Sequence, residues 1–253
     1  RANMRKTGWW AALAALCAGL GLLGSGAQAI TFRHDVAASE YLALADRFPM
    51  VGEFAGCTAT LVAPDVALTA AHCVDEDGNG QLDDDFFEFY PFVLGDDLNA
   101  PTHEVFLVDI HIHPSWVRRD LAGYDLSLLV LEEPITDVAP LPISAQDPVG
   151  HIATMVGFGT YGTGQAILDE ENTRKRAAQN TVDGILGFGF GPNDNGALVF
   201  DFDHPEGTTN SVTREYGTPS DPLPLPLEGS TSFGDSGGPL LVDFGEGFSI
   251  VAV

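Results

Sequence analysis

The amino-acid sequence predicts an all-β protein, and three observations support this prediction. After residue 30, most apolar residues lie in short segments that alternate with polar residues or are rich in β-branched side chains. Gly, Pro and Asp separate these segments, and few stretches have a helical period. We therefore predict strands at 57–62, 66–69, 105–112, 126–131, 151–157, 198–202 and 239–242, with Pro-rich connectors at 134–148 and 219–226.

Residues 1–29 have the features of a secretory signal peptide. Two basic residues precede an apolar run over 9–23, and Ala-Gln-Ala at 27–29 is typical of a signal peptidase site. We assign residues 1–3, which precede the first Met, to upstream sequence without structural meaning. The sequence therefore predicts a secreted chain, extracellular or periplasmic, that starts at Ile30 and keeps no membrane segment.

Cysteine usage agrees with export. Cys17 lies within the predicted signal peptide, and Leu16 before it stands where a lipidation signal would place a small residue. The remaining chain keeps only Cys57 and Cys73. An even pair of cysteines in an exported protein predicts one disulfide.

The charge balance is strongly acidic. The 36 acidic residues all follow residue 29, where only eight Lys and Arg side chains accompany them, so this part carries 28 net negative charges. Such a charge repels nucleic acids and anionic membranes and keeps a protein soluble where salt screens its self-repulsion. We therefore expect neither partner, and we regard adaptation to a saline habitat as a hypothesis.

The strongest local motif is Gly-Asp-Ser-Gly-Gly-Pro at 234–239. Its glycines allow the backbone to expose the Ser236 hydroxyl and to turn amide groups toward one point. A Gly-x-Ser-x-Gly string also fits the nucleophile turn of α/β-hydrolases, whose Asp and His follow the Ser. Only 17 residues follow Ser236, and none is His. The esterase alternative therefore fails.

Two further strings supply partners for a nucleophilic Ser. Thr-Ala-Ala-His-Cys places His72 at the end of a predicted strand, and Tyr-Asp-Leu-Ser-Leu-Leu places Asp125 at the start of another. Taken singly, His72 would be interpreted as a core residue, Asp125 as a strand-end cap and Ser236 as a turn residue. Their joint occurrence in the order His, Asp, Ser indicates nucleophilic catalysis.

These three strings, with a cysteine pair around the His segment, resemble the chymotrypsin/trypsin family of serine proteases over about residues 30–253. The resemblance implies two six-stranded antiparallel β-barrels, an N-terminal one at about 30–135 and a C-terminal one at about 149–253. We expect the second barrel to be incomplete, because the elements that follow the nucleophile in the family are missing after Val253.

The resemblance also implies a role for each residue. Ser236 would be the nucleophile, His72 the general base and then acid, and Asp125 the acceptor that fixes the His tautomer. The amides of Gly234 and Ser236 would form the oxyanion hole. The Cys57–Cys73 pair matches the family's spacing around the His.

Asp235 beside the nucleophile would be costly in a packed turn without a partner. The family pairs this Asp with the free α-amino group of an apolar residue, and Ile30 lies 42 residues before His72. We expect signal peptidase itself to create this activating terminus. The family's usual Gly-Gly after the Ile is absent, since Thr31 follows it.

In the family, the residue six before the nucleophile lies at the base of the primary specificity pocket. Here it is Ser230. A neutral base argues against cleavage after Arg or Lys and favours uncharged, apolar P1 side chains. Ser232 replaces a Cys that commonly braces this loop.

The acidic segment at 75–83 resembles the first nine positions of an EF-hand calcium loop. Phe86 stands at position 12, where a bidentate Glu belongs. The alternative is a solvated acidic loop. A structural calcium ion would use Asp75, Asp77, Asn79, Gln81 and Asp83. His111 and His113 share one strand face, but without a third ligand nearby in sequence we expect surface or packing roles.

The sequence therefore predicts a secreted serine endopeptidase that acts on proteins or peptides through an acyl-enzyme intermediate. We expect a monomer that requires no cofactor for catalysis. The main alternative is a non-catalytic, protease-like binding protein, although none of the three catalytic residues is replaced. A calcium-binding adhesion module would explain the acidic segment but not the three catalytic strings.

Overall fold

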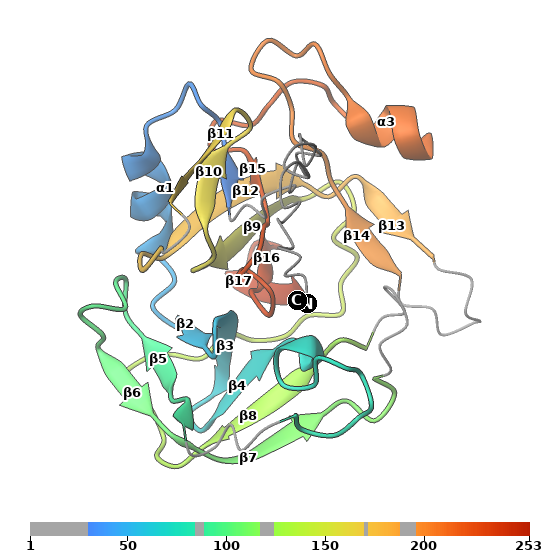
Figure 1. Ribbon diagram of the computed structural model, residues 1–253. Helices are drawn as coiled ribbons and strands as arrows, with labels where there is room; N and C mark the ends of the chain where they lie inside the picture. The colour runs from blue at the N-terminus through green and yellow to red at the C-terminus, as the bar shows by residue number, and fades with distance from the viewer. Residues whose placement is uncertain (1–29, 84–88, 117–123, 170–171, 188–195) are drawn as a thin grey trace, which may run out of the picture.

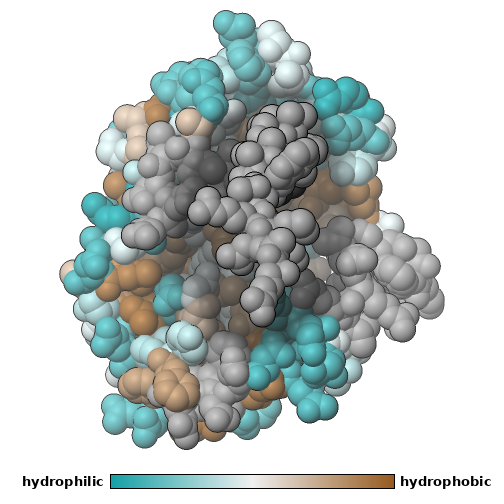
Figure 2. Space-filling model, in the orientation of Figure 1, coloured by the Kyte–Doolittle hydropathy of each residue, from teal (hydrophilic) through white to brown (hydrophobic). Residues whose placement is uncertain are grey.

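The computed structural model describes residues 30–83, 89–116, 124–169, 172–187 and 196–253. Strands dominate these residues, which confirms the all-β prediction. The predicted signal peptide at 1–29 and position 12 of the acidic segment, Phe86, lie outside them. In the view of Figure 2, hydrophilic residues surround smaller hydrophobic patches.

The first lobe is one antiparallel sheet with the strand order β6-β5-β2-β3-β4-β8-β7 (Figure 1). Although β6 and β7 lie at opposite ends of this order, only Phe106 separates them along the chain. The sheet therefore curls into a nearly closed barrel. Its strands are β2 (Val51–Phe54), β3 (Cys57–Ala63), β4 (Val66–Thr69), β5 (Phe92–Leu94), β6 (His103–Val105), β7 (Leu107–Ile112) and β8 (Ser127–Leu131).

The second lobe contains two four-stranded sheets and a hairpin among its described residues, in the orders β12-β9-β16-β17, β11-β10-β1-β15 and β13-β14. In Figure 1 it lies above the first lobe. Its strands are β1 (Thr31–Phe32), β9 (Ile152–Gly157), β10 (Tyr161–Thr163), β11 (Ala166–Asp169), β12 (Arg176–Thr181), β13 (Gly184–Leu186), β14 (Ala197–Val199), β15 (Gly229–Ser230), β16 (Leu240–Asp243) and β17 (Phe248–Ala252).

The start of the described chain packs against the second lobe. β1 pairs with β10 and β15, and helix α1 (Ala38–Ala45) packs on β12. Residues 30–45 therefore pack mainly on the second lobe and do not form part of the first barrel, to which the sequence assigned them. The buried face of α1, which includes Tyr41 and Leu44, explains this placement.

Two further helical segments matter for the site and its surroundings. The 3-10 helix η1 (Ala71–Cys73) follows β4 directly. Helix α3 (Ser211–Tyr216) begins after Asn210, whose side chain accepts a hydrogen bond from the Thr213 amide, and ends at Gly217 in a left-handed conformation.

An apolar core joins the lobes. One cluster of buried side chains includes Val51 and Leu68 from the first lobe together with Val156, Ala177 and Leu241 from the second. Burying a large aliphatic side chain contributes roughly 1.5 to 3 kcal/mol. The lobes therefore meet through a shared hydrophobic layer.

The strand predictions hold best where both faces are buried. Strand 66–69 is observed with the predicted bounds, whereas 105–112 is divided at Phe106, because Val105 pairs with β5 and Leu107 pairs with β8. The predicted strand at 198–202 is shorter, since pairing of β14 with β13 ends at Val199. Single-sequence periodicity does not contain these partner changes.

Candidate active site

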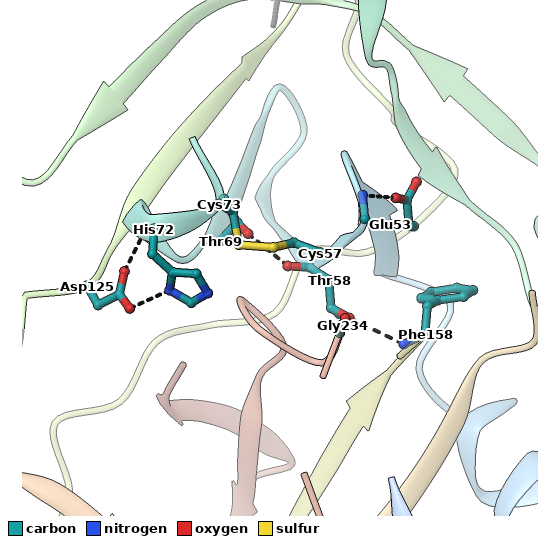
Figure 3. Close-up of a disulfide and its surroundings, with 10 residues drawn as sticks. Glu53, Cys57, Thr58, Thr69, His72, Cys73, Asp125, Phe158 and Gly234 are labelled. Carbon is teal, nitrogen blue, oxygen red and sulfur yellow. Dashed lines mark hydrogen bonds and ion pairs between the residues drawn. A yellow bond between two sulfur atoms is a disulfide. The ribbon is translucent and has the colours of Figure 1, made fainter. Parts of the chain in front are cut away.

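His72 and Asp125 form a close pair in the first lobe. The Asp125 Oδ2 lies 2.6 Å from His72 Nδ1, and Asp125 Oδ1 accepts a hydrogen bond of 2.8 Å from the His72 backbone amide. Figure 3 shows both contacts. With Nδ1 held by the carboxylate, the other ring nitrogen, Nε2, is available to a reacting group.

The backbone before Asp125 has an unusual conformation. Tyr124 has a φ of 62°, and the Leu126 amide donates a 2.8 Å hydrogen bond to the Tyr124 carbonyl across Asp125. The Tyr124 ring stacks on His113 with ring centres 4.8 Å apart. A bulky residue in the left-handed region is strained, so surrounding contacts must hold it. This tight turn presents Asp125 to His72.

The predicted Cys57–Cys73 disulfide is present and joins η1 to the start of β3 (Figure 3). It closes a segment with a sequence separation of 16 residues. In the chain-entropy view, a loop of this size contributes about 3 kcal/mol. The bond therefore fixes the segment that carries His72.

Thr58 connects the His72 segment to the Ser236 turn. Its amide donates a 2.8 Å hydrogen bond to the Ser236 carbonyl, and its hydroxyl donates one of 3.1 Å to the Gly234 carbonyl. The Thr69 hydroxyl donates a 2.8 Å bond to the Thr58 carbonyl. Thr58 is fully buried between the lobes (Figure 3). Sequence reasoning missed it, although its position directly after Cys57 placed it near His72.

The turn around Ser236 requires glycine. Gly234 and Gly237 have φ values of 93° and 79°. A Cβ on Gly237 would lie 2.2 Å from both the Thr58 carbonyl oxygen and the Thr69 hydroxyl. The chain therefore brings the turn around Ser236 into direct contact with the strands that carry Thr58 and Thr69.

Two backbone amides of this turn are available to an external hydrogen-bond acceptor. The Asp235 amide donates to the Ser232 carbonyl at 3.1 Å, and the Gly238 amide donates to the Asp235 carbonyl at 2.8 Å. Among the described residues, neither the Gly234 nor the Ser236 amide donates an internal hydrogen bond. In the same part of the chain, no hydrogen bond joins the Ser236 hydroxyl to His72. Such bonds often form only with substrate.

Asp235 is buried directly beside this turn. Its carboxylate accepts 3.1 Å hydrogen bonds from the Gly159 and Ser232 amides. Burial raises its pKa to about 7, while hydrogen bonds from these amides and from Ile30 act in the opposite direction. A Cβ on Gly157 would lie 2.1 Å from Asp235 Oδ1, so glycine is required there. No sequence pattern around Gly157 indicates this requirement.

The backbone nitrogen of Ile30 lies next to the Asp235 carboxylate. The residue is only 2% exposed, and its backbone contributes a hydrogen bond to the Asp235 carboxylate. The next residue, Thr31, pairs with Ser230. The structure therefore brings Ile30 next to Ser230 and Asp235, which lie far from it in sequence.

A family model described as Trypsin matches residues 45–187, more than half of the chain. The chain belongs to the trypsin family. The matched segment includes His72 and Asp125 and ends before Ser236. No curated protein sequence matches significantly. Family membership supports a serine protease hydrolase that acts on proteins or peptides.

Ser230, which the sequence predicts at the base of a specificity pocket, lies on β15 and is partly exposed. Its hydroxyl makes a weak contact of 3.5 Å with the Thr231 carbonyl. The position therefore offers a neutral hydroxyl rather than a carboxylate. The described residues of this trypsin-family chain include no helix with the length and apolar character needed to cross a membrane.

The acidic segment converges as the calcium prediction requires. Carboxylate oxygens of Asp75, Asp77 and Asp83 lie within 4.8 Å of one another. The buried Asp75 already accepts hydrogen bonds from Trp116 Nε1 at 2.9 Å and from the Gly80 amide at 2.7 Å. Calcium binding at this trypsin-family loop stays a prediction.

Asn79, His111 and His113 each make a local contact. The Asn79 side chain accepts a 2.8 Å hydrogen bond from the Gln81 amide. His111 lies 3.4 Å from Asp109, while His113 stacks on Tyr124. Within the described chain, neither His joins a group of metal-ligating side chains.

Proposed function

We propose that this protein is a secreted serine endopeptidase with His72, Asp125 and Ser236 as its catalytic residues. The observation that best supports this proposal is the set of hydrogen bonds made by Thr58. This buried residue directly follows Cys57, whose disulfide with Cys73 holds the His72 segment in place. Its backbone amide and its hydroxyl donate hydrogen bonds to the turn that contains Ser236. The His72–Asp125 pair and the available Gly234 and Ser236 amides add the remaining functions of acyl transfer.

In the proposed reaction, His72 Nε2 removes the Ser236 hydroxyl proton as the oxygen attacks the peptide carbonyl. Asp125 holds Nδ1 and stabilises the imidazolium that forms. The amides of Gly234 and Ser236 donate to the oxyanion, each worth about 3 to 4 kcal/mol in sites of this kind. The imidazolium then protonates the leaving amine. Water, deprotonated by His72, hydrolyses the acyl-enzyme and restores Ser236.

The proposal includes the mature terminus and the substrate preference. Cleavage after residue 29 would convert the Ile30 amide into an ammonium group beside Asp235, with which its backbone already makes contact. The neutral Ser230 supports a preference for uncharged or apolar P1 side chains. N-terminal sequencing of the secreted protein tests the first point, and a start other than Ile30 contradicts it.

A fluorophosphonate probe tests catalysis with the full-length protein. We expect covalent labelling at Ser236, no labelling of Ser236→Ala, and slow labelling of Asp125→Asn. The alternative, a protease-like binding protein, predicts a folded chain that remains unlabelled. Circular dichroism on each variant separates loss of folding from loss of reactivity.

A further inference from the structure

A second group of acidic residues surrounds a cavity of about 60 Å³ in the second lobe. Its members come from separate parts of the chain: after β12, after β14, after α3 and before β15. They are Asp183, Asp201, Asp203, Asp221 and Glu228. The cavity is lined entirely by residues between 180 and 228 and therefore contains none of the catalytic residues proposed above.

Three of these acids are almost completely buried, with Asp201 5%, Asp203 4% and Glu228 2% exposed. Asp203 Oδ1 is buried and has no hydrogen-bond partner in the described structure, and the same is true of Asp183 Oδ2. Buried carboxylate oxygens normally have hydrogen-bond partners, because burying a charged group without a partner costs roughly several kcal/mol. These two oxygens are therefore free to bind a ligand that the described protein atoms do not supply.

The carboxylates of Asp201 and Glu228 are held by hydrogen bonds from the protein. Asp201 Oδ2 accepts a 2.9 Å bond from the Ser211 amide, and Oδ1 accepts a 3.0 Å bond from the Ser220 hydroxyl. Glu228 accepts bonds of 2.6 and 2.7 Å from the Asp203 and Leu225 amides. Such donors favour ionised carboxylates. The cavity therefore holds negative charge, and Asp203 Oδ1 and Asp183 Oδ2 are its buried oxygens without a partner among the described residues.

The surrounding protein supplies little positive charge to this cluster. Burial, followed by repulsion from Asp201 and Glu228, raises the pKa of Asp203 to about 7. Burial also raises the pKa of Glu228, and Arg33 lowers it only as a minor effect. Arg33 is engaged with Asp35 at 2.7 Å and with the Leu225 carbonyl at 2.9 Å. A cation in the cavity would relieve the repulsion.

We propose that this cavity binds one Ca²⁺ ion, with the unpartnered oxygens of Asp203 and Asp183 as ligands. All polar lining groups are oxygen donors or amides, which suit a hard cation. Ca²⁺ binds roughly six to eight oxygen ligands in flexible geometry, whereas Mg²⁺ requires a compact octahedral arrangement. The described carboxylates here are less tightly gathered than those at 75–83, so water completes the shell.

The ion would stabilise the segment that enters the proposed specificity pocket. Glu228 lies two residues before Ser230, and its carbonyl accepts a 3.1 Å bond from the Tyr41 hydroxyl. Calcium would thereby connect the Asp183 and Asp203 loops to the base of that pocket.

Thermal melts of the full-length protein test the proposal. At constant ionic strength, CaCl₂ at about 100 times its dissociation constant should raise the wild-type Tm by about 5 to 10 °C over EDTA. Asp203→Asn should lose this rise, yet melt in EDTA at or above the wild-type temperature, because it removes a repelled carboxylate. Should this variant fail to fold, Asp183→Asn carries the same expectation.

Two controls separate this site from others. Glu104→Gln removes one exposed charge in the first lobe and should retain the full rise. Asp77→Asn, in the acidic segment at 75–83, should retain the part that Asp203→Asn removes. An unchanged calcium response in Asp203→Asn and Asp183→Asn overturns the proposal, as does an equal rise with MgCl₂. Fluorophosphonate labelling of the wild type is measured in a separate experiment. Its result tests the proposed catalytic function independently of calcium binding.

Discussion

Retaining Ala29 in front of Ile30 should leave the Asp235 carboxylate without an ammonium partner. In the structure, where Ile30 contributes an amide, burial raises the Asp235 pKa from 3.8 to about 7. A difference of about three pKa units corresponds to about 4 kcal/mol between the protonation states. This energy is the cost, at pH 8, of folding the extended chain with an ionised Asp235.

The sign of the pH dependence follows from the raised pKa. The folded extended chain keeps a proton on Asp235 that the unfolded chain releases near pH 3.8. Its stability from this group is therefore complete below pH 3.8 and is lost as the pH rises to about 7. In the chain that starts at Ile30, the ammonium group stabilises the ionised form of Asp235. The loss of stability with rising pH should therefore be smaller.

Urea unfolding at pH 5 and pH 8 measures both effects, with Ser236→Ala in every chain to prevent self-cleavage. At pH 8, Asp235→Asn should stabilise the extended chain by up to about 4 kcal/mol. In the chain that starts at Ile30, the same substitution leaves a buried ammonium group unpaired and should destabilise by about 3 to 5 kcal/mol. An effect of the same sign in both chains would refute the ion-pair reasoning.

Three further predictions concern single positions. Thr58→Val should cost about 1 to 3 kcal/mol in urea unfolding, because the Gly234 carbonyl loses its donor, and should lower kcat more than it raises KM; an unchanged kcat would show that the Thr58 hydroxyl does not position the nucleophile. Ser230→Asp should raise the cleavage of Arg and Lys peptides relative to Phe and Leu peptides, and an unaltered ranking in a peptide library would remove Ser230 from the pocket base. If the segment at 75–83 binds calcium, Asp77→Asn should lose the part of the calcium-dependent Tm rise that Asp203→Asn retains; a rise fully accounted for by Asp203 would favour a solvated loop.

Local strings and long-range contacts differed in how well the sequence predicted them. The motifs around His72 and Ser236 are short and contiguous, and the cysteine pair constrained its own partner. Thr58 could not be recognised in the same way, because its importance comes from bonds to a turn 176 residues away. The acidic cavity likewise combines side chains from four separate segments, with no periodic pattern to connect them.

The start of the chain shows the same limit. Alternation along a strand reports which face is buried but not against which sheet. The short β1 was therefore assigned to the first barrel, although it pairs with β10 and β15 in the second lobe. The cost of burying a charge indicated that Asp235 needs a partner, and the family resemblance rather than periodicity pointed to Ile30.

Thr58 is buried at the contact between the two lobes. Its bonds to Gly234 and Ser236 cross from one lobe to the other, whereas the disulfide and the His72–Asp125 pair lie within the first. A small separation of the lobes would break the former while leaving the latter intact. Heating or mild denaturant should therefore abolish peptide hydrolysis before either barrel melts, so that activity serves as a sensitive gauge of lobe docking.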